Sequence, residues 1–381
     1  MFRRHATPMS CVAVLLLFLA ACAGGGGSYT GTNLPPTATP IPPTPTPNVG
    51  LVSASTAAIT IPSSMASLSL GSYQAASVAA TQGGLILAGA PTGSTISNNA
   101  GFLSLAYLDF KSHTPQTIAT ATTATDKVAR GITSFVTGGD WVAYVQQGQQ
   151  GQDWELWAVN ATTGTKQAID SALKEQGIGL LPNSFATDGT DVVWATAVAG
   201  QTTALLRAYD LTTNTVRTLV TLPAGSFTDI TLVNRLLFYQ SVAPITNVGT
   251  SWLWLLTQPQ PTTITAQPLG TVALNSHYLI WYDADPQMLD LYDIVAGKTQ
   301  QVAAAPCVNP IIAQDRPFIA CLDDVDDQYQ VIRTPSGTSA PFGLHATGGF
   351  GTISNDRVYW VPEPNPLSSN NVVDYFDLPK S

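Results

Sequence analysis

Charged residues are scarce in this sequence of 381 residues. Only 10% of them are Asp, Glu, Lys or Arg, and 24 acidic residues outnumber 15 basic ones, which gives a formal net charge of −9. No Lys/Arg cluster offsets this balance. An acidic surface without a basic patch repels phosphate backbones, so we expect no nucleic-acid partner.

Histidine and cysteine are also rare, with four of each. His113, His277 and His345 do not pair at the spacing of metal ligands, so a histidine metal centre is not expected. The sequence has no Gly-x-Ser-x-Gly motif and no segment outside its repeats that could hold a hydrolase domain. We therefore name no catalytic residue and expect no cofactor.

Long hydrophobic runs are absent, and the one apolar run near the N-terminus is short. Residues Cys11–Ala21 are too few to cross a hydrocarbon core, which needs about 20 helical residues. The run follows Arg3 and Arg4 and closes with Leu19-Ala20-Ala21-Cys22, the pattern of a bacterial lipobox. We interpret residues 1–21 as a lipoprotein signal peptide and Cys22 as the lipidated first residue of an exported protein. An ordinary secretory signal, cut after an A-x-A-like site, is the alternative.

Residues 22–50 have a different composition from the rest of the chain. A run of glycines, 24–27, precedes a Pro/Thr-rich stretch, 35–47. Such a segment cannot bury enough apolar surface to fold, and its prolines favour a polyproline II spacer of about 40 Å. We expect a disordered tether that holds the following domain away from the membrane. Lipid on Cys22 would place the protein at the cell membrane, facing the extracellular or periplasmic side.

A short apolar strand after a polar turn recurs along residues 51–381. Its copies are Leu85-Ile86-Leu87, Trp141-Val142-Ala143, Val192-Val193-Trp194, Leu236-Leu237-Phe238, Leu279-Ile280-Trp281, Phe318-Ile319-Ala320 and Val358-Tyr359-Trp360. They lie 39 to 56 residues apart. This spacing is typical of propeller blades, each of which contains four strands.

A second motif follows several of these strands and predicts a hairpin. The clearest copy is Tyr209-Asp210-Leu211-Thr212-Thr213-Asn214-Thr215, and related copies begin at Leu108, Val159 and Tyr292. The fifth residue after the opening one is His113, Gly164, Asn214 or Gly297, all types that tolerate a positive φ. Each unit thus reads as strand, hairpin, strand, strand.

Together the two motifs resemble those of TolB-like and quinoprotein-like β-propellers. The best match is Asp188-Gly189-Thr190-Asp191-Val192-Val193-Trp194 followed by Tyr209-Asp210-Leu211, and a looser pattern covers residues 83–381. The resemblance implies an all-β propeller of seven blades, each of four antiparallel strands. A six-bladed ring and a pair of β-sandwiches are the alternatives. Because propellers serve as scaffolds, binders and enzymes, the resemblance does not imply an activity.

The seventh unit stops where its last hairpin should begin, at Tyr375-Phe376-Asp377-Leu378. Residues 51–80 contain spare strand material, in Ala57–Ile61 and Ser67–Leu70. We predict that an N-terminal strand completes the last blade and closes the ring.

In an exported protein, Cys307 and Cys321 are candidates for a disulfide. Their midpoint is Gln314, in a polar stretch where the turn of the sixth unit should fall, so the two cysteines would face each other across a hairpin. A bridge there would stabilise the fold by about 3 kcal/mol in the chain-entropy model. A pair of reduced, buried thiols is the alternative.

Two acidic stretches are weak candidates for a calcium site. Asp323, Asp324, Asp326 and Asp327 supply hard oxygen ligands on a predicted loop, and Asp283 and Asp285 do so on another. Neither stretch follows the known calcium-loop pattern, and a solvated charged turn explains both. We therefore assign no metal site.

Five tryptophans, Trp141, Trp154, Trp157, Trp252 and Trp254, could stack on a carbohydrate. Their alternation along strands fits packing between blades better.

We expect a membrane-anchored, non-catalytic propeller whose loops or channel bind or scaffold a protein or an envelope glycan. The alternative is a glycan-acting hydrolase or lyase with carboxylates in the central channel. Two facing carboxyl groups at a channel mouth would favour the enzyme, whereas an apolar or Asn/Gln-lined mouth would favour the binder.

Overall fold

A computed structural model describes the part of the chain that follows the predicted tether. The described residues are 59, 66–94, 97–98, 101–122, 130–148, 153–172, 174, 184–197, 203–223, 227–242, 248–283, 288–303, 307–313, 318–323, 328–333, 339–344, 351–354, 356–362 and 371–378. The predicted signal peptide, Cys22 and the tether therefore lie outside the described residues.

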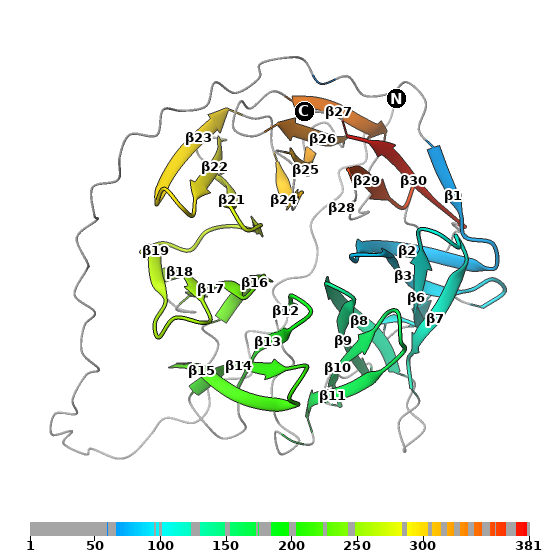
Figure 1. Ribbon diagram of the computed structural model, residues 1–381, viewed down its shortest axis with the longest axis horizontal. Coiled ribbons are helices and arrows are strands. Elements are labelled where there is room, and N and C mark those ends of the chain that lie inside the picture. Colours follow the sequence, from blue (N-terminus) through cyan, green and yellow to red (C-terminus); the bar gives the residue numbers. More distant parts are fainter. Residues whose placement is uncertain are drawn as a thin grey trace, which may run out of the picture. The chain divides into compact units, whose positions relative to one another are not determined.

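The described strands form seven antiparallel sheets, which are the blades of a ring (Figure 1). Blade 1 contains β2 (Tyr73–Ala80), β3 (Gly84–Pro91), β6 (Ser104–Asp109) and β7 (Pro115–Thr120). Blade 2 contains β8 (Arg130–Gly138), β9 (Trp141–Gly148), β10 (Glu155–Asn160) and β11 (Lys166–Ser171). Blade 3 contains β12 (Phe185–Thr187), β13 (Asp191–Ala197), β14 (Thr203–Asp210) and β15 (Thr215–Pro223). Blade 4 contains β16 (Phe227–Val233), β17 (Leu236–Val242), β18 (Gly249–Leu255) and β19 (Thr262–Thr265).

The remaining blades follow the same plan. Blade 5 contains β20 (Val272–Leu274), β21 (Tyr278–Asp283), β22 (Met288–Asp293) and β23 (Lys298–Ala303). Blade 6 contains β24 (Val308–Ile312), β25 (Phe318–Asp323), β26 (Gln328–Arg333) and β27 (Ser339–Leu344). Blade 7 contains β28 (Thr352–Ser354), β29 (Arg357–Trp360), β30 (Val372–Asp377) and β1 (Ala66–Ser69). None of the described residues is helical. The predicted all-β propeller of seven four-stranded blades is confirmed.

The N-terminal strand closes the ring, as predicted. Strand β1 pairs antiparallel with β30, with Ala66 opposite Tyr375 and Ser69 opposite Val372 (Figure 1). The Ser67 hydroxyl donates a hydrogen bond to the Asp374 carboxylate at 2.6 Å. Residues far apart in sequence therefore complete one blade. The seven described sheets, and not this closure, exclude the six-bladed ring and the pair of sandwiches.

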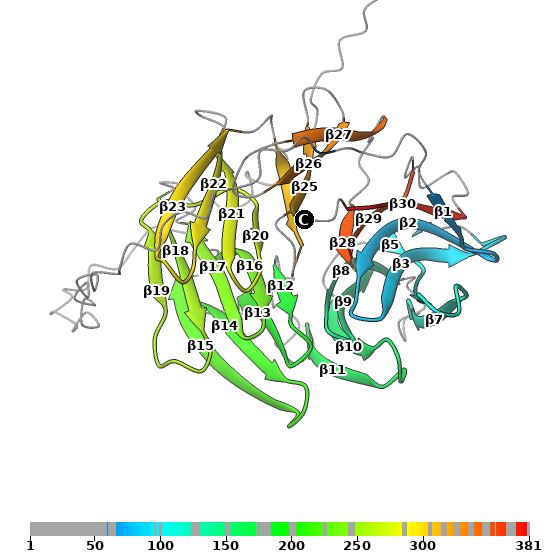
Figure 2. The same ribbon diagram turned by 45° about the horizontal axis from the view of Figure 1, so that its top comes forward.

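The recurrent apolar motif is the second strand of every blade: β3, β9, β13, β17, β21, β25 and β29. Seven of the eight residues of β3 are buried. These strands are apolar on both faces because a neighbouring blade covers each face. The blades are seen stacked against one another around the ring in Figure 2.

The predicted hairpin turns have the expected backbone conformation. The φ angles of His113, Gly164, Asn214 and Gly297 are 53°, 73°, 58° and 63°. In the copy of blade 3, the Asp210 carboxylate accepts hydrogen bonds from the N–H groups of Thr212 and Thr213 at 2.9 and 2.8 Å. The acid in the motif thus fixes the turn by pairing with backbone donors.

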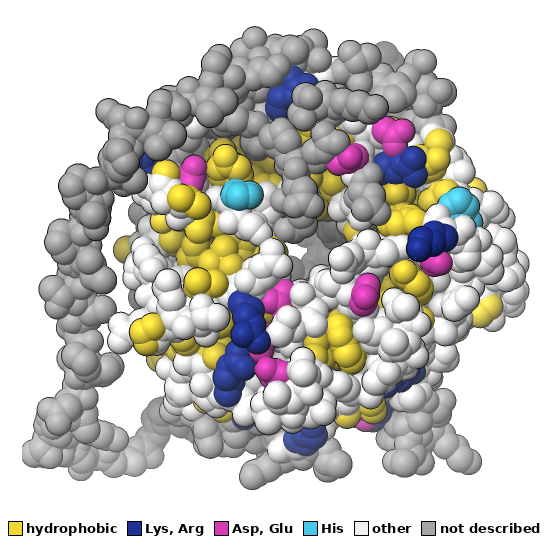
Figure 3. Space-filling view, in the orientation of Figure 1, with side chains coloured by type: hydrophobic (Ala, Val, Ile, Leu, Met, Phe, Trp, Pro, Cys, Tyr) yellow, Lys and Arg dark blue, Asp and Glu magenta, His cyan; other side chains and the backbone are white. Residues whose placement is uncertain are grey.

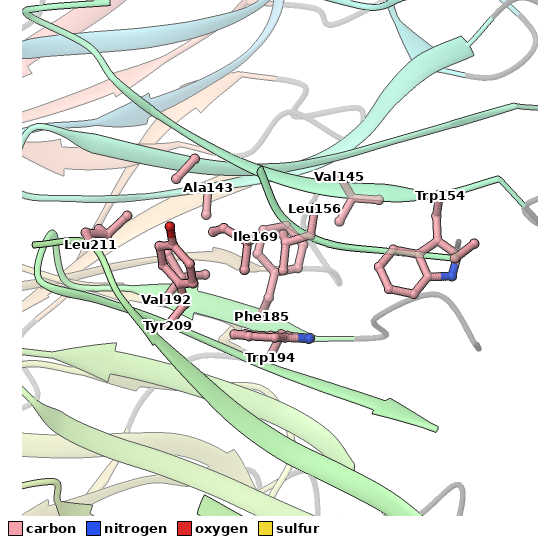
Figure 4. Close-up of a cluster of buried hydrophobic side chains, with 12 residues drawn as sticks. Ala143, Val145, Trp154, Leu156, Ile169, Phe185, Val192, Trp194, Tyr209 and Leu211 are labelled. Atoms are coloured by element: carbon pink, nitrogen blue, oxygen red, sulfur yellow. The ribbon is translucent and has the colours of Figure 1, made fainter. Parts of the chain in front are cut away.

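The core lies between blades, and tryptophans fill much of it. Figure 4 shows the cluster between blades 2 and 3, where Trp154 and Trp194 are both fully buried. Trp141 packs against the same cluster, Trp157 packs between blades 1 and 2, and Trp252 and Trp254 pack between blades 3 and 4. The packing interpretation of the five tryptophans is confirmed.

A small hairpin departs from the regular plan. Strands β4 (Ser97–Asn98) and β5 (Gly101–Phe102) lie between β3 and β6, yet β5 pairs with β8 of blade 2, with Phe102 opposite Ile132. Gly101 has a φ of 142°, and a Cβ there would collide with the carbonyl of Ile132. This hairpin ties blade 1 to blade 2.

Cys307 and Cys321 form a disulfide inside blade 6. Their Cα atoms are 5.2 Å apart, and both residues are buried in the cluster between blades 5 and 6. Cys307 directly precedes β24 and Cys321 lies on β25, which pairs with β24. The bridge therefore joins neighbouring strands of one hairpin.

Candidate functional site

The central channel opens at one end into a cavity of about 820 Å³. Its walls come from the ends of the first strands and from the turns that follow them, which we call the inner turns. The lining residues are Ala80, Thr81, Gln82, Thr137, Gly138, Gly139, Thr187, Asp188, Leu232, Val233, Asn234, Ser276, Ile311, Ile312, Ala313, Thr352, Ile353, Ser354 and Asp356. We call this end of the channel the channel mouth. Figure 3 shows the face on which it opens, where uncharged side chains and some acidic and basic ones lie around the central hollow.

Hydrogen bonds join the inner turns of neighbouring blades. Between blades 7 and 1, the Thr352 hydroxyl accepts from the Ala80 N–H at 3.1 Å, and the Ser354 hydroxyl donates to the Thr81 carbonyl at 3.4 Å. Between blades 1 and 2, the Gln82 N–H donates to the Gly139 carbonyl at 3.1 Å. These bonds connect three consecutive blades around the mouth.

Glycines let blades 2 and 3 approach backbone to backbone. A Cβ on Gly138 would collide with the carbonyl of Thr187 and with the Cα of Asp188. A Cβ on Gly189 would lie 2.7 Å from the Gly138 carbonyl oxygen, and Gly189 has a φ of 88°. Only glycine fits these two positions without a backbone shift.

Side chains make the next three links of the ring. From blade 3, the Asp188 carboxylate accepts from the Arg235 N–H of blade 4 at 2.6 Å. The Asn234 amide of blade 4 donates to the Ser276 hydroxyl of blade 5 at 2.8 Å. The Asn275 amide of blade 5 donates to the Ala313 carbonyl of blade 6 at 3.0 Å. We call this series of contacts between inner turns, from blade 7 through to blade 6, the collar.

Because the collar joins the inner turns of neighbouring blades, the mouth is a rigid and mostly uncharged surface. Thr81, Thr187 and Thr352 are buried, while Gln82, Asn234 and Ser276 are exposed and offer amide and hydroxyl groups to a ligand. Groups held in place by neighbouring blades lose little conformational entropy when a ligand binds.

Two carboxylates, Asp188 and Asp356, also line the mouth. One oxygen of Asp188 accepts from the N–H groups of Thr190 and Asp191 at 2.8 and 2.9 Å, and the other accepts from Arg235. Asp188 therefore holds two inner turns together. Its two oxygens are thus engaged by backbone donors of blades 3 and 4.

A buried acid lies behind Asp188, with two arginines beside it. Asp191 is fully buried; its Oδ1 accepts from Arg217 Nη2 at 3.0 Å, and its Oδ2 lies 3.6 Å from Arg235 Nε. Burial raises the pKa of Asp191, the charge of Arg217 opposes this rise, and the charge of Asp188 adds to it. The ion cluster spans blades 3 and 4 at the mouth side of the ring.

A second pair of carboxylates lies at the other end of β8, away from the mouth. Arg130 Nε contacts Asp153 at 2.8 Å, and Arg130 Nη1 contacts Glu155 at 2.8 Å. Burial alone would raise the pKa of each acid. Hydrogen bonds from the Gly148 N–H and from Arg130 lower the pKa of Asp153 instead. Hydrogen bonds from Trp157, Arg130 and Gln146 lower that of Glu155. Both acids stay ionised at neutral pH, so neither fits the role of a general acid.

Of the site residues named from the sequence, only Cys307 and Cys321 are described with their side chains. Cys22 lies outside the described residues, as do Asp324, Asp326 and Asp327, and only the backbone of Asp323 is described. The Cys307–Cys321 bridge is interior to the ring. Within the described ranges, no three His, Cys, Asp or Glu residues are grouped to hold a metal ion. Among the same residues, no helix has the length and apolar character needed to cross a membrane.

Sequence reasoning missed the collar. Its residues are the Thr, Asn, Ser and Gly of the polar turns that precede each apolar motif, as in Thr137-Gly138-Gly139 and Asn275-Ser276. Because such residues are common in any turn, only their equivalent position in successive units could have indicated that they meet around one axis.

No model of a known protein family matches the sequence, and no curated protein matches it. Solved structures do match. A chain in the crystal structure of the mitotic checkpoint complex is 9% identical, with a TM-score of 0.53 over 87% of this chain and 98% of that chain. TolB from Acinetobacter baumannii is 13% identical, with a TM-score of 0.43 over 65% of this chain and 62% of that chain.

A structure from a study of two prolyl endopeptidases is 11% identical, with a TM-score of 0.46. The match covers 61% of this chain and only 39% of that chain. These likenesses concern the fold alone. The chain is thus a seven-bladed β-propeller, as its resemblance to TolB-like propellers implies.

Proposed function

We propose that this protein is a lipid-anchored, extracytoplasmic binding protein that catalyses no reaction. Its channel mouth would recognise a protein or another envelope component and hold it near the membrane. The collar carries this proposal, because it presents amide and hydroxyl groups on a surface fixed by hydrogen bonds between blades.

The lining of the mouth favours a binder over the glycan-acting hydrolase or lyase. Asp188 is occupied by three backbone donors, and the other lining carboxylate, the exposed Asp356, belongs to blade 7 and not to a blade next to Asp188. The exposed side chains of Gln82, Asn234 and Ser276 are uncharged.

Asp153 and Glu155 lie at the other end of β8, where hydrogen bonds from the Gly148 N–H and Arg130 lower the pKa of Asp153, and those from Trp157, Arg130 and Gln146 lower the pKa of Glu155. Glycoside hydrolysis by two carboxyl groups needs one that keeps its proton near neutral pH. Asp191, whose pKa is raised by burial, does not line the mouth and is fully buried beside Arg217 and Arg235.

The binding proposal is tested by capturing partners from the native envelope. Tagged full-length protein would be expressed in its own host, cross-linked, purified and analysed by mass spectrometry. The double variant Asn234→Ala/Ser276→Ala removes a link of the collar and two exposed polar groups, whereas Asn160→Ala changes a turn residue of blade 2 that does not line the mouth.

A partner that is lost with the double variant and retained with Asn160→Ala would support the proposal. Retention by both variants would place binding elsewhere. Recovery of glycan that the purified protein shortens would contradict the non-catalytic role.

The anchor is tested separately. Replacing Cys22 with Ser should abolish incorporation of an alkyne-labelled fatty acid and release the protein from the membrane fraction. Labelling that persists in Cys22→Ser would contradict lipidation at this residue.

A further inference from the structure

Two arginines contact Asp191, close to the mouth-lining Asp188 and Asn234 but outside the lining itself. Arg235 follows the mouth-lining Asn234 in the inner turn of blade 4, and Arg217 lies on β15 of blade 3. Their side chains are 42% and 43% exposed. Figure 3 shows basic side chains next to acidic ones beside the central hollow. We call Arg217 and Arg235 the arginine pair.

One buried acid holds the arginine pair. Both guanidinium groups contact Asp191, and within the described part of the chain no other carboxylate lies within 4.0 Å of either. The Oδ2 atom of Asp191 is buried and accepts no hydrogen bond, since Arg235 Nε is 3.6 Å away. Each guanidinium has five N–H groups, so a single shared carboxylate leaves donors that face solvent.

The neighbouring acids direct their oxygens elsewhere. Asp188 accepts from three backbone N–H groups, and Asp210 accepts from those of Thr212 and Thr213. They contribute negative charge around the arginine pair but do not occupy its donors.

The backbone of Arg235 is unusual. Its φ is 63°, a conformation that favours glycine and asparagine, and the preceding Asn234 has a φ of 49°. A strained residue of this kind costs about 1 kcal/mol or more, and such residues cluster at functional sites. Asn or Gly at position 235 would relieve this strain, but either would remove one of the two guanidinium groups beside the buried Asp191.

We propose, on the basis of the proposed binding function, that the arginine pair binds the C-terminal carboxylate of a partner polypeptide. The planar guanidinium groups suit a carboxylate, and the adjoining amide and hydroxyl groups of Asn234 and Ser276 suit the peptide groups that precede it. A chain of net charge −9 with Asp188 and Asp210 near the arginine pair repels a ligand with repeated negative charges, so a single terminal carboxylate fits better than a polyanion.

The test compares two peptide pools on the purified full-length protein. One is a pool of fluorescent hexapeptides with free C-terminal carboxylates, and the other is the same pool with C-terminal amides; binding is measured by anisotropy at low salt. Arg235→Asn removes the guanidinium and suits the positive φ, and Arg217→Gln removes the second one. Arg357→Gln is the control, because Arg357 is similarly exposed and pairs with Asp377 in blade 7.

We expect the acid pool to bind at least tenfold more tightly than the amide pool. Arg235→Asn and Arg217→Gln should each abolish this preference, and Arg357→Gln should keep it. An unchanged or raised melting temperature of Arg235→Asn would show that lost binding is not lost folding.

Other outcomes overturn the inference in distinguishable ways. Equal binding of both pools, weakened by Asn234→Ala, would refute the carboxylate site but leave the mouth as a binding site. Tighter, arginine-dependent binding of a uronic-acid trimer would refute the polypeptide assignment. Absence of binding by either pool, while envelope partners still depend on Asn234 and Ser276, would refute the inference and spare the proposed function.

Discussion

At the residue scale, a few polar side chains hold the inner turns of the channel mouth together. Asp188 joins the inner turns of blades 3 and 4 through hydrogen bonds to the N–H groups of Thr190, Asp191 and Arg235. An aspartate before a glycine is common in turns, and the sequence predicts the turn at Asp188-Gly189. The bond to Arg235 links residues far apart in sequence, so no local pattern could predict it.

Asp188→Ala should lower the free energy of unfolding by about 2 kcal/mol, because three backbone donors lose a charged acceptor. Asp188→Asn keeps one acceptor oxygen and should cost less. Denaturant titration of both variants measures the difference. Equal stability of Asp188→Ala and the wild-type protein would show that Asp188 does not hold the two turns.

Arg130 should make stability depend on pH. The pKa values of Asp153 and Glu155 are lower than the usual values of 3.8 and 4.5. The two ionised acids therefore contribute fully to the free energy of unfolding above these usual pKa values, and this contribution is lost as the pH falls through the lowered pKa values. The protein should therefore lose stability below about pH 4.5, by about 1 kcal/mol after allowance for solvent screening.

Arg130→Gln should flatten this dependence and cost stability at neutral pH. Denaturant titrations at several pH values, with Arg357→Gln as the control, would measure it. An identical pH dependence in Arg130→Gln and the wild-type protein would show that Arg130 does not contribute to the lowered pKa values of Asp153 and Glu155.

At the element scale, local chemistry predicts most of the fold. The apolar motifs are the second strands of the blades, and the turns at Gly164, Asn214 and Gly297 have the positive φ that their residue types indicate. The β4–β5 hairpin was not predicted, because its pairing with β8 depends on the close approach of Gly101 to Ile132 and not on a strong strand signal. Strand pairings between blades are tertiary contacts, so they leave no repeating pattern of residues from which a single sequence could predict them.

Two glycines with different surroundings test the collar. Gly138→Ala would push a Cβ into the backbone of Thr187 and Asp188, so it should destabilise the ring by more than about 2 kcal/mol and disturb the mouth. Gly164→Ala meets no atom within 4 Å and should cost only about 1 kcal/mol, from its positive φ of 73°. Thermal unfolding of the two variants compares them, and equal losses would mean that blades 2 and 3 are not in close contact at the mouth.

At the scale of the whole molecule, the ring is closed by β1 and its sixth blade is braced by the disulfide. The predicted closure followed from counting strands, since the seventh unit lacked one. The disulfide sits away from the channel mouth, so its role is in stability and not in binding.

Replacing both Cys307 and Cys321 with Ala should reduce the free energy of unfolding by about 3 kcal/mol, the value for a closed loop of about 15 residues. Capture of the envelope partner should not change at temperatures where the variant stays folded. Denaturant unfolding with and without a reductant measures the first effect. A variant as stable as the oxidised protein would contradict the bracing role.

Site-specific cross-linking in the native membrane would show whether the channel mouth is the face that binds the partner. A photo-reactive amino acid would replace Gln82, which is exposed at the mouth, or Thr117, which is exposed on β7 at the outer edge of blade 1. The account predicts a discrete cross-linked partner from position 82 and none from position 117. Cross-linking from position 117 alone, or equally from both positions, would contradict it.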